Sequence, residues 1–206
     1  EMLRRREITT LVTWAHDPAH SNPAVGFDNR AAMAQMTRTV LNHGHRSVAV
    51  IMAHTKHNDR TTERLIGIRQ EVSRWDLNPD TLPVVETTYH IDAAREAFRQ
   101  IMAGPSRPTA IICGNDVLAV GALLEARAIG LTVPGDLSIT GFDDMDIATI
   151  VDPGLTTMHV PHRDMGRQSA ISLLTSLEHG TPIAPIRLEA RLVERGSLGP
   201  VPSRGS

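Results

Sequence analysis

Hydrophobic and polar positions along the chain fall into two alternating kinds of segment. Short aliphatic and β-branched runs without polar alternation are typical of strands buried on both faces of a parallel sheet. Between these runs, apolar residues recur every three or four positions, which predicts amphipathic helices. The expected strands are residues 9–14, 47–53, 82–88, 109–113 and 137–142, and the expected helices are residues 29–43, 61–75, 93–103, 117–129 and 162–179.

Residues that favour helix ends support these boundaries. Asp28 and Asp92 come just before two of the predicted helices and are good N-cap residues. Gly44, Gly130 and Gly180 directly follow predicted last turns, where a left-handed residue commonly ends a helix. Strands alternating with helices predict an α/β fold with a doubly wound parallel sheet.

Residues 186–193 follow a different pattern. Ile186, Leu188 and Leu192 alternate with Arg187 and Arg191, so apolar and charged side chains take opposite faces. This period of two predicts a single edge strand with one face in water. The residues after 200 are rich in Pro, Gly and Ser, and we expect a loose tail there.

Polar loops follow three of the predicted strands, at residues 54–64, 114–116 and 143–146. The loops after parallel strands gather at one edge of a sheet, where ligands of open α/β sheets bind. We therefore expect Arg64, Asn115 and Asp143 to converge there. A guanidinium fork, an amide and a carboxylate together suit a small polyhydroxylated or heterocyclic ligand.

Each of these side chains also has a purely structural explanation. Asn115 or its neighbour Asp116 is a good helix cap, and acidic residues at 143–144 are common in turns. Arg64 has acidic neighbours with which it could pair on a surface. The spacing alone leaves these alternatives open.

Composition excludes several classes of protein. The formal charge is only −2, and the sole basic cluster is Arg4–Arg6, which does not suffice to neutralise a nucleic-acid backbone. Cys113 is the only cysteine, so neither an internal disulfide nor a thiolate metal cluster can form. No run approaches the roughly 20 apolar residues needed to cross a bilayer. We expect no membrane partner and an intracellular, cytoplasmic location.

The chain also lacks the motifs of common catalytic and metal sites. The pairs His16/His20 and His54/His57 lie in loops without a third ligand nearby, so we expect no metal. There is no G-x-S-x-G elbow and no glycine-rich phosphate loop after any predicted strand. We therefore expect no cofactor and no enzyme activity.

Two long stretches carry a resemblance to a known family. They are "VGFDNRAAMAQMTRTVLNHGHRSVAVI" followed by "RTTERLIGIRQ", and "AIICGNDVLAVGALLEARAIGLTVPGDLSITGFDDMDIATIVDPGLTTMHVPHRDMGRQSA". They resemble the effector-binding domain of the LacI/GalR family of bacterial transcription regulators. The similarity extends from about residue 8 to residue 196.

The resemblance implies a type I periplasmic-binding-protein-like fold, with two doubly wound parallel-sheet subdomains joined by three crossovers and an effector between them. The N-terminal subdomain, incomplete here, would hold residues 1–46 and 161–182, and the C-terminal subdomain residues 47–160 and 183–200, with a tail at 201–206. Family members grip the effector through residues that fall on Arg64, Asn115 and Asp143. Asp116 is then the better candidate for the helix cap.

The resemblance also implies weaker effector contacts from Trp14, His16 and Asp92. Asp92 departs from the family, whose members often have an aromatic residue near this position, and Val160 stands where some sugar-responsive members have Gln. The effector is therefore expected to be a sugar or a nucleobase-like compound of unknown identity.

The family's DNA-binding headpiece has no counterpart in these 206 residues, so we expect a piece of a longer regulator. Operator DNA would be bound only through that headpiece, and a homodimer is the expected assembly. The alternative is a periplasmic solute-binding protein of a sugar transporter, which shares the fold.

Overall fold

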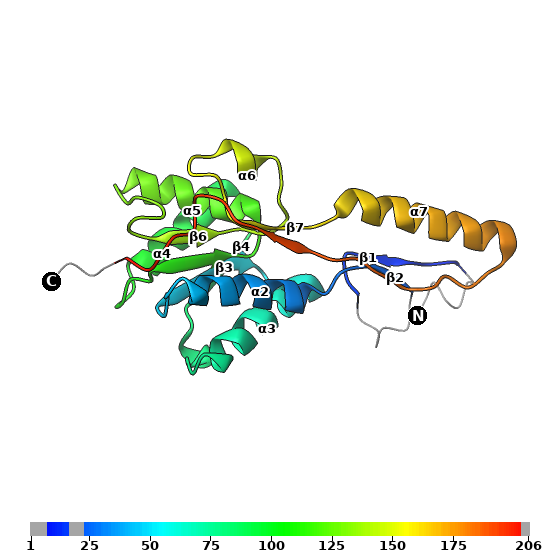
Figure 1. The fold of residues 1–206 in the computed structure, drawn as a ribbon, viewed down its shortest axis with the longest axis horizontal. Coiled ribbons are helices and arrows are strands. Elements are labelled where there is room, and N and C mark those ends of the chain that lie inside the picture. Colours follow the sequence, from blue (N-terminus) through cyan, green and yellow to red (C-terminus); the bar gives the residue numbers. More distant parts are fainter. Residues whose placement is uncertain (1–7, 17–22, 203–206) are drawn as a thin grey trace. The chain divides into compact units, whose positions relative to one another are not determined.

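The computed structural model describes residues 8–16 and 23–202, which form two compact units (Figure 1). The first unit takes its residues from the chain up to Asn29 and from Val160–Ala190, and the second from Arg30–His159 and the chain after Arg191. Residues 30–46 and 183–190 thus group differently from the subdomains that the resemblance implied. The subdomain boundaries themselves stay a prediction.

The first unit is built on a three-stranded parallel sheet in the order β1-β2-β8. Helix α7, His162–His179, packs against β1 and β2 and ends at Gly180, whose φ of 65° is left-handed as expected. Gly26 is required in this sheet because a Cβ there would overlap the main chain of Ala15. The strands are β1 (Val12–Thr13), β2 (Ala24–Gly26) and β8 (Ile186–Arg187).

The second unit contains a four-stranded parallel sheet in the order β4-β3-β5-β6. All three pairings in this sheet are parallel, so the polar loops that follow β3, β5 and β6 leave from the same edge. This edge is called the carboxyl edge below, and the opposite one the amino edge. The strands are β3 (Val48–Ala53), β4 (Val84–Thr87), β5 (Ala110–Cys113) and β6 (Ser138–Thr140).

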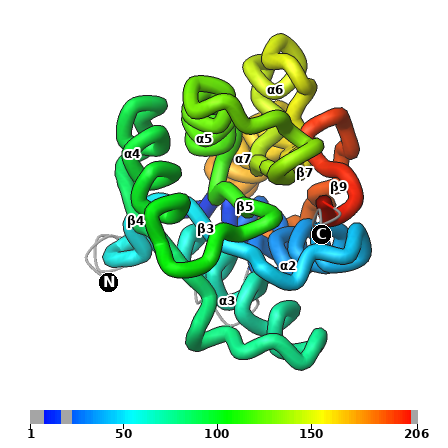
Figure 2. Tube along the Cα trace, turned by 90° about the vertical axis from the view of Figure 1, so that its left-hand side faces the viewer, coloured from blue at the N-terminus to red at the C-terminus, as the bar shows by residue number. Residues whose placement is uncertain are grey.

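Helices cover both faces of this sheet (Figure 2). Helices α4 and α5 lie over one face, and α2 and α3 over the other. The antiparallel pair of β7 (Thr157–His159) and β9 (Arg191–Val193) completes the unit. The helices are α2 (Asn29–Asn42), α3 (Asp59–Arg74), the 3-10 helix η1 (Pro79–Thr81), α4 (Ile91–Met102), α5 (Asp116–Ala128) and the short α6 (Ile147–Ile150).

The core of the second unit confirms the expected α/β arrangement. Every residue of β3 and β5 is buried, as continuous apolar runs predict for the middle of a parallel sheet. Strand β6 ends the sheet but is buried as well, and its Thr140 forms a parallel bridge to Thr156 on its outer side. Strand β4, at the sheet edge, and β1, at the edge of the other sheet, are only partly buried. The expectation of burial on both faces was therefore wrong for these two, because an edge strand lacks a neighbour on one side.

The expected single strand at 186–193 is a second difference. Its first residues, in β8, pair with β2, and its last residues pair with β7. Residues 188–190, which connect these two strands along the chain, belong to neither strand. An alternating pattern reports which side chains are exposed, but it does not report which strand is the partner. The short strands β2 and β7 were also missed for lack of a long apolar run.

None of the described helices has the length and apolar character needed to span a membrane. Gly44 and Gly130 have φ values of 92° and 81°, so both end their helices in the left-handed conformation that their position predicted. Helix α4 begins at Ile91 with His90 as N-cap, so Asp92 lies inside the first turn rather than before it.

Candidate functional site

Arg64 reaches the carboxyl edge from helix α3. The helix begins at Asn58, whose side chain accepts a hydrogen bond from the main-chain N–H of Thr61 at 3.2 Å. One turn after Arg64, Gly67 lets α3 lie close to α2, because a Cβ there would overlap the carbonyl oxygen of Arg30. The Arg64 side chain is only 7% exposed.

The Arg64 guanidinium is fixed on three sides. Nη1 donates a hydrogen bond to the carbonyl oxygen of Gly114 at 2.8 Å, and Nη2 lies 3.5 Å from Oδ1 of Asp143. The Cζ atom is 3.8 Å from the centre of the Phe142 ring. Burial lowers the pKa of Arg64, and the Asp143 carboxylate opposes that shift. An arginine stays charged at neutral pH, so the edge holds a fixed, partly desolvated fork of donors.

Asn115 follows the residue that Arg64 contacts, and it caps helix α5. Its Oδ1 accepts a hydrogen bond from the main-chain N–H of Leu118 at 2.9 Å. The expectation that Asp116 would be the cap is therefore wrong. A cap uses only the oxygen of the amide, so the NH₂ group of Asn115 remains able to donate to a ligand.

Asp143 lies in an unusual turn after β6. Both Asp143 and Asp144 have positive φ, 107° and 55°. Such conformations are uncommon for residues other than glycine and persist only where the surroundings hold them. The main-chain N–H of Asp143 donates to the carbonyl oxygen of Met158 at 2.9 Å, which ties the turn to β7.

The Asp144 carboxylate contacts two basic residues other than Arg64. Its Oδ1 lies 2.7 Å from Nη2 of Arg195, and its Oδ2 lies 2.9 Å from Nδ1 of His159. Burial opposes ionisation, but the hydrogen bonds from these two residues outweigh it and lower the pKa of Asp144. Asp144 thus anchors the turn, while its neighbour Asp143 faces the guanidinium.

Asp116 is fully buried beneath the same turn. Its Oδ1 accepts a hydrogen bond from the hydroxyl of Thr157 at 2.6 Å, and its Oδ2 accepts one from the main-chain N–H of Met145 at 2.7 Å. Burial raises the pKa of Asp116 to about 7, against these hydrogen bonds and with help from the charges of Asp143 and Asp144. Neither the composition nor the spacing of the sequence indicated that Asp116 is buried and bonded to the turn after β6.

The structure therefore brings Arg64, Asn115 and Asp143 together at the carboxyl edge. Asp92 does not join the contacts of Arg64: its side chain is 96% exposed, and its recorded ion pair is to Arg95 at 3.9 Å. Tyr89, which we did not select from the sequence, is linked to helix α3 instead. Its hydroxyl lies 3.3 Å from that of Thr61, one turn before Arg64. Its position directly after β4 was the signal that could have found it.

Trp14 and His16 belong to the first unit. Trp14 has a φ of 71°, its carbonyl oxygen accepts a hydrogen bond from Nδ2 of Asn29 at 2.8 Å, and its N–H points to the sulfur of Met165. The main-chain N–H of His16 donates to the carbonyl oxygen of Phe27 at 3.2 Å. Both follow β1, as expected, and their role toward an effector stays a prediction.

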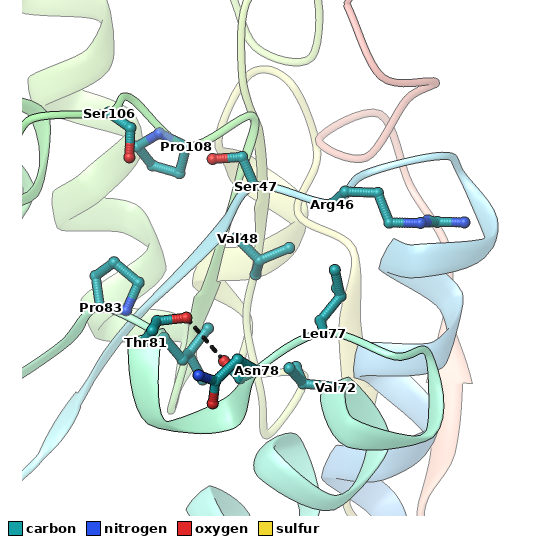
Figure 3. A pocket seen from close by; sticks show the side chains of 11 residues that line it. Arg46, Ser47, Val48, Val72, Leu77, Asn78, Thr81, Pro83, Ser106 and Pro108 are labelled. Atoms are coloured by element: carbon teal, nitrogen blue, oxygen red, sulfur yellow. Dashed lines mark hydrogen bonds between the residues drawn. The ribbon is translucent and has the colours of Figure 1, made fainter.

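A cavity of about 290 Å³ lies at the amino edge of the same sheet (Figure 3). Arg46, Ser47 and Val48 at the start of β3 line it together with residues of η1 and of the loop before β5, but none of the three clustered site residues does. Within the described residues, no group of three or more His, Cys, Asp or Glu side chains could hold a metal ion. His20, of the first predicted histidine pair, lies outside those residues.

Comparison with known proteins agrees with this architecture. The family model of the periplasmic binding protein-like domain matches residues 37–198. The repressor CytR of Escherichia coli (strain K12) is 33% identical over 181 residues, which cover 87% of this chain and 53% of CytR. The chain thus spans about half the length of the curated relatives that it matches.

Solved structures give the same result. The transcription regulator GntR from Chromobacterium violaceum has a TM-score of 0.87 and 28% identity, with 96% of this chain and 72% of that chain covered. A complex of the transcriptional regulator CelR with cellobiose has a TM-score of 0.86 and 26% identity, over 95% of this chain and 61% of that one. These relatives are transcription regulators and not enzymes, and they do not favour the transporter alternative. The similar proteins include LacI-family transcription regulators, and the chain itself belongs to the family of periplasmic binding protein-like domains.

Proposed function

We propose that these residues form the effector-sensing domain of a transcription repressor, and that a small polar metabolite binds at Arg64, Asn115 and Asp143. The observation that carries this proposal is the buried guanidinium of Arg64, held between the Gly114 carbonyl and Asp143 at the carboxyl edge. A buried charge is costly unless it is paired and hydrogen-bonded. Such a group at the ligand edge of an α/β sheet is typical of a binding site.

The donor and acceptor set indicates the ligand class. Arg64 offers donors only, Asn115 offers an amide donor, and Asp143 accepts two hydrogen bonds. Vicinal hydroxyl groups of a sugar, or the ring nitrogen and exocyclic groups of a nucleobase, match this set. The cellobiose bound to the similar regulator CelR supports the sugar alternative. Tyr89 and Asp92, which follow β4 in the second unit, are candidates for additional contacts.

Control of DNA binding follows from differential affinity. An effector shifts a repressor between two arrangements only if it binds one of them more tightly. Coupling of about 1–3 kcal/mol changes operator affinity by roughly 5- to 150-fold. We propose that operator DNA is bound by a helix-turn-helix part outside these 206 residues and that the domain acts in the cytoplasm.

We further propose a homodimer. Large apolar side chains on α5, on α6 and on the loop before α6 are exposed: Leu124 is 45%, Met145 is 43% and Ile150 is 79% exposed. Burying such side chains against a second copy is favourable. Sedimentation velocity of the I150E variant should show a shift toward monomer, and an unchanged dimer would remove Ile150 from the interface.

The binding proposal is tested by thermal shift with cellobiose, D-ribose and adenosine. At least one of these compounds should raise the Tm of the unaltered chain. The variant R64A should lose that shift, whereas R60A, on an exposed side chain one turn earlier, should keep it. Because Asn115 is also a cap, N115S is the sharper change: serine caps a helix but does not reach as far as the amide. A full shift in both R64A and N115S would reject the site.

A further inference from the structure

The turn that presents Asp143 needs a support that its own sequence does not provide. Two successive residues other than glycine, Asp143 and Asp144, have left-handed φ. Backbone in such conformations is energetically unfavourable and must be held by surrounding groups. The support must therefore come from neighbouring elements.

Asp116 brackets this turn from both sides. Its main-chain N–H donates to the carbonyl oxygen of Phe142 at 2.9 Å, just before the strained residues. Its carboxyl oxygen Oδ2 accepts from the N–H of Met145 at 2.7 Å, just after them. The first residue of helix α5 is thus attached to both ends of the strained segment. Asn115, the preceding residue, belongs to the proposed binding site. The start of helix α5 therefore holds two of the site residues: Asn115 directly, and Asp143 through Asp116.

Thr157 extends this connection to β7. Its hydroxyl donates to Oδ1 of Asp116 at 2.6 Å and lies 3.4 Å from the main-chain N–H of Asp144. Gly141 keeps this space open, because a Cβ there would overlap Oδ1 of Asp116 and contact Leu155. Asp116 is therefore 0% exposed, and its two carboxyl oxygens each have one hydrogen-bond partner, Thr157 and Met145.

The charges around Asp116 disfavour its ionised form. Asp143 and Asp144 face it from the turn, and both are acidic. Arg64 from α3 is the opposing cation, while Cys113 of β5 is a buried thiol and contributes no positive charge. Opening the turn would let water reach the carboxyl group and would favour ionisation. By linkage, ionisation must then favour opening.

We propose that Asp116 is a positioning residue of the binding site: its buried carboxyl group clamps the Asp143–Asp144 turn. The closed turn is favoured when Oδ1 carries a proton, because no charge is then buried: the Thr157 hydroxyl accepts this proton in a hydrogen bond, and Oδ2 still accepts from the Met145 N–H. The proposal rests on the proposed effector site. It adds that the site tightens in mildly acid solution and loosens as the pH rises through neutrality. The raised pKa of Asp116 is consistent with that direction.

Amide hydrogen exchange tests the clamp without any effector. In the unaltered chain, the protection of the Met145 N–H, corrected for intrinsic exchange, should fall as the pH rises from about 6 to 8. The variant D116N keeps an acceptor for Met145 and has no proton to lose, so its protection should stay high and flat. The Asp136 N–H, hydrogen-bonded to Thr132 at the amino edge, serves as a control amide in the same sample. A flat profile in the unaltered chain would overturn the proton dependence.

A second pair of variants guards against simple misfolding. T157V removes the donor to Asp116, whereas T140V changes another fully buried threonine, whose hydroxyl has no hydrogen-bond partner in the described part of the chain. T157V should lower Met145 protection at least ten-fold and move the NMR titration midpoint of Asp116 upward. T140V should change neither. Equal protection in the two variants would overturn the clamp.

The binding consequence is measured with the same three probes, cellobiose, D-ribose and adenosine. Whichever of them binds the unaltered chain should bind T157V at least ten-fold more weakly and T140V equally well. Unchanged affinity in a T157V protein with a loosened turn would overturn the positioning role. If none of the three binds the unaltered chain, the proposed ligand class fails, while the exchange measurements still decide whether Asp116 holds the turn.

Discussion

Arg64 and Arg46 make the same kinds of contact at opposite edges of one sheet. Both donate hydrogen bonds to main-chain carbonyl oxygens, Arg64 to Gly114 and Arg46 to Leu41 and His45. Both also lie over an aromatic ring, at 3.8 Å from the centre of Phe142 and 4.7 Å from that of Trp75. Arg64, however, is buried beside a carboxylate in a strained turn, and Arg46 is exposed beside a cavity. The two edges thus differ in the burial of the arginine side chain and in the backbone strain of the adjoining turn, and we chose the candidate site by these two properties rather than by the presence of a cavity.

Two acidic residues, one at each edge, have pKa values shifted in opposite directions. Burial raises the pKa of Asp116 at the carboxyl edge to about 7. At the amino edge, hydrogen bonds from the side chain and main chain of Thr132 lower the pKa of Asp136. A raised pKa means stability that is present at low pH and lost as the pH rises, whereas a lowered one means stability that is lost only in acid.

The largest expected effect is on pH-dependent stability. A pKa raised from 3.8 to about 7 makes the folded state less stable at pH 8 than at pH 4, on the order of 4 kcal/mol at about 1.4 kcal/mol per unit. Urea unfolding of the unaltered chain and of D116N at a series of pH values should give curves that diverge across this window. The other carboxylates are common to both proteins and cancel. Parallel curves would show that Asp116 titrates normally.

Replacing the two arginines should give the next largest contrast. R64A leaves the buried carbonyl of Gly114 without its donor, which costs about 2–3 kcal/mol of unfolding free energy. R46A removes an exposed side chain that has no ion pair with an acidic residue in the described part of the chain, so about 1 kcal/mol or less is expected. Guanidinium unfolding measures both. Equal losses would mean that burial does not separate the two edges.

Two asparagines allow a finer version of this comparison. Asn115 and Asn78 each accept a hydrogen bond at 2.9 Å from a main-chain N–H, at the start of α5 and of the 3-10 helix η1. N115A should cost about 1 kcal/mol, because its cap is buried, and N115S should recover most of that loss. N78A should cost only a few tenths of a kcal/mol, since the exposed N–H can bond to water. A larger loss in N78A would reverse the ranking.

The smallest effect is expected at the cavity. S106A alters an exposed lining residue and should change the free energy of unfolding by less than about 0.5 kcal/mol. It should also leave the thermal shift by cellobiose, D-ribose or adenosine unchanged. A lost shift in S106A, with the shift in R64A intact, would move the binding site to the amino edge.

The sequence predicted the sheet and its helices wherever a long periodic pattern was present. Strand β3 and the end of helix α7 at Gly180 were placed correctly, because each depends on a few neighbouring residues: a continuous apolar run for the strand and a glycine for the helix end. Residues 186–193 were misassigned because strand partners are set by distant residues. The expectation of convergence at the carboxyl edge succeeded because parallel strands impose it geometrically.

The division of labour between Asn115 and Asp116 could not be predicted. Both residue types are good helix caps. Asp116 instead faces the interior because Thr157 and Met145, which are distant in sequence, lie there as its hydrogen-bond partners. Asp92 was selected and Tyr89 was missed because helix α4 starts two residues earlier than expected, which places the Asp92 side chain, 96% exposed, inside its first turn. Residue type limits what a side chain can do, and packing selects among those possibilities.

Arg64, Asn115 and Asp143 lie in the segments that follow three different strands: helix α3, the start of helix α5 and the turn after β6. The strands before these segments are entirely buried. A substitution in one of these segments can therefore alter what the domain recognises without repacking its interior.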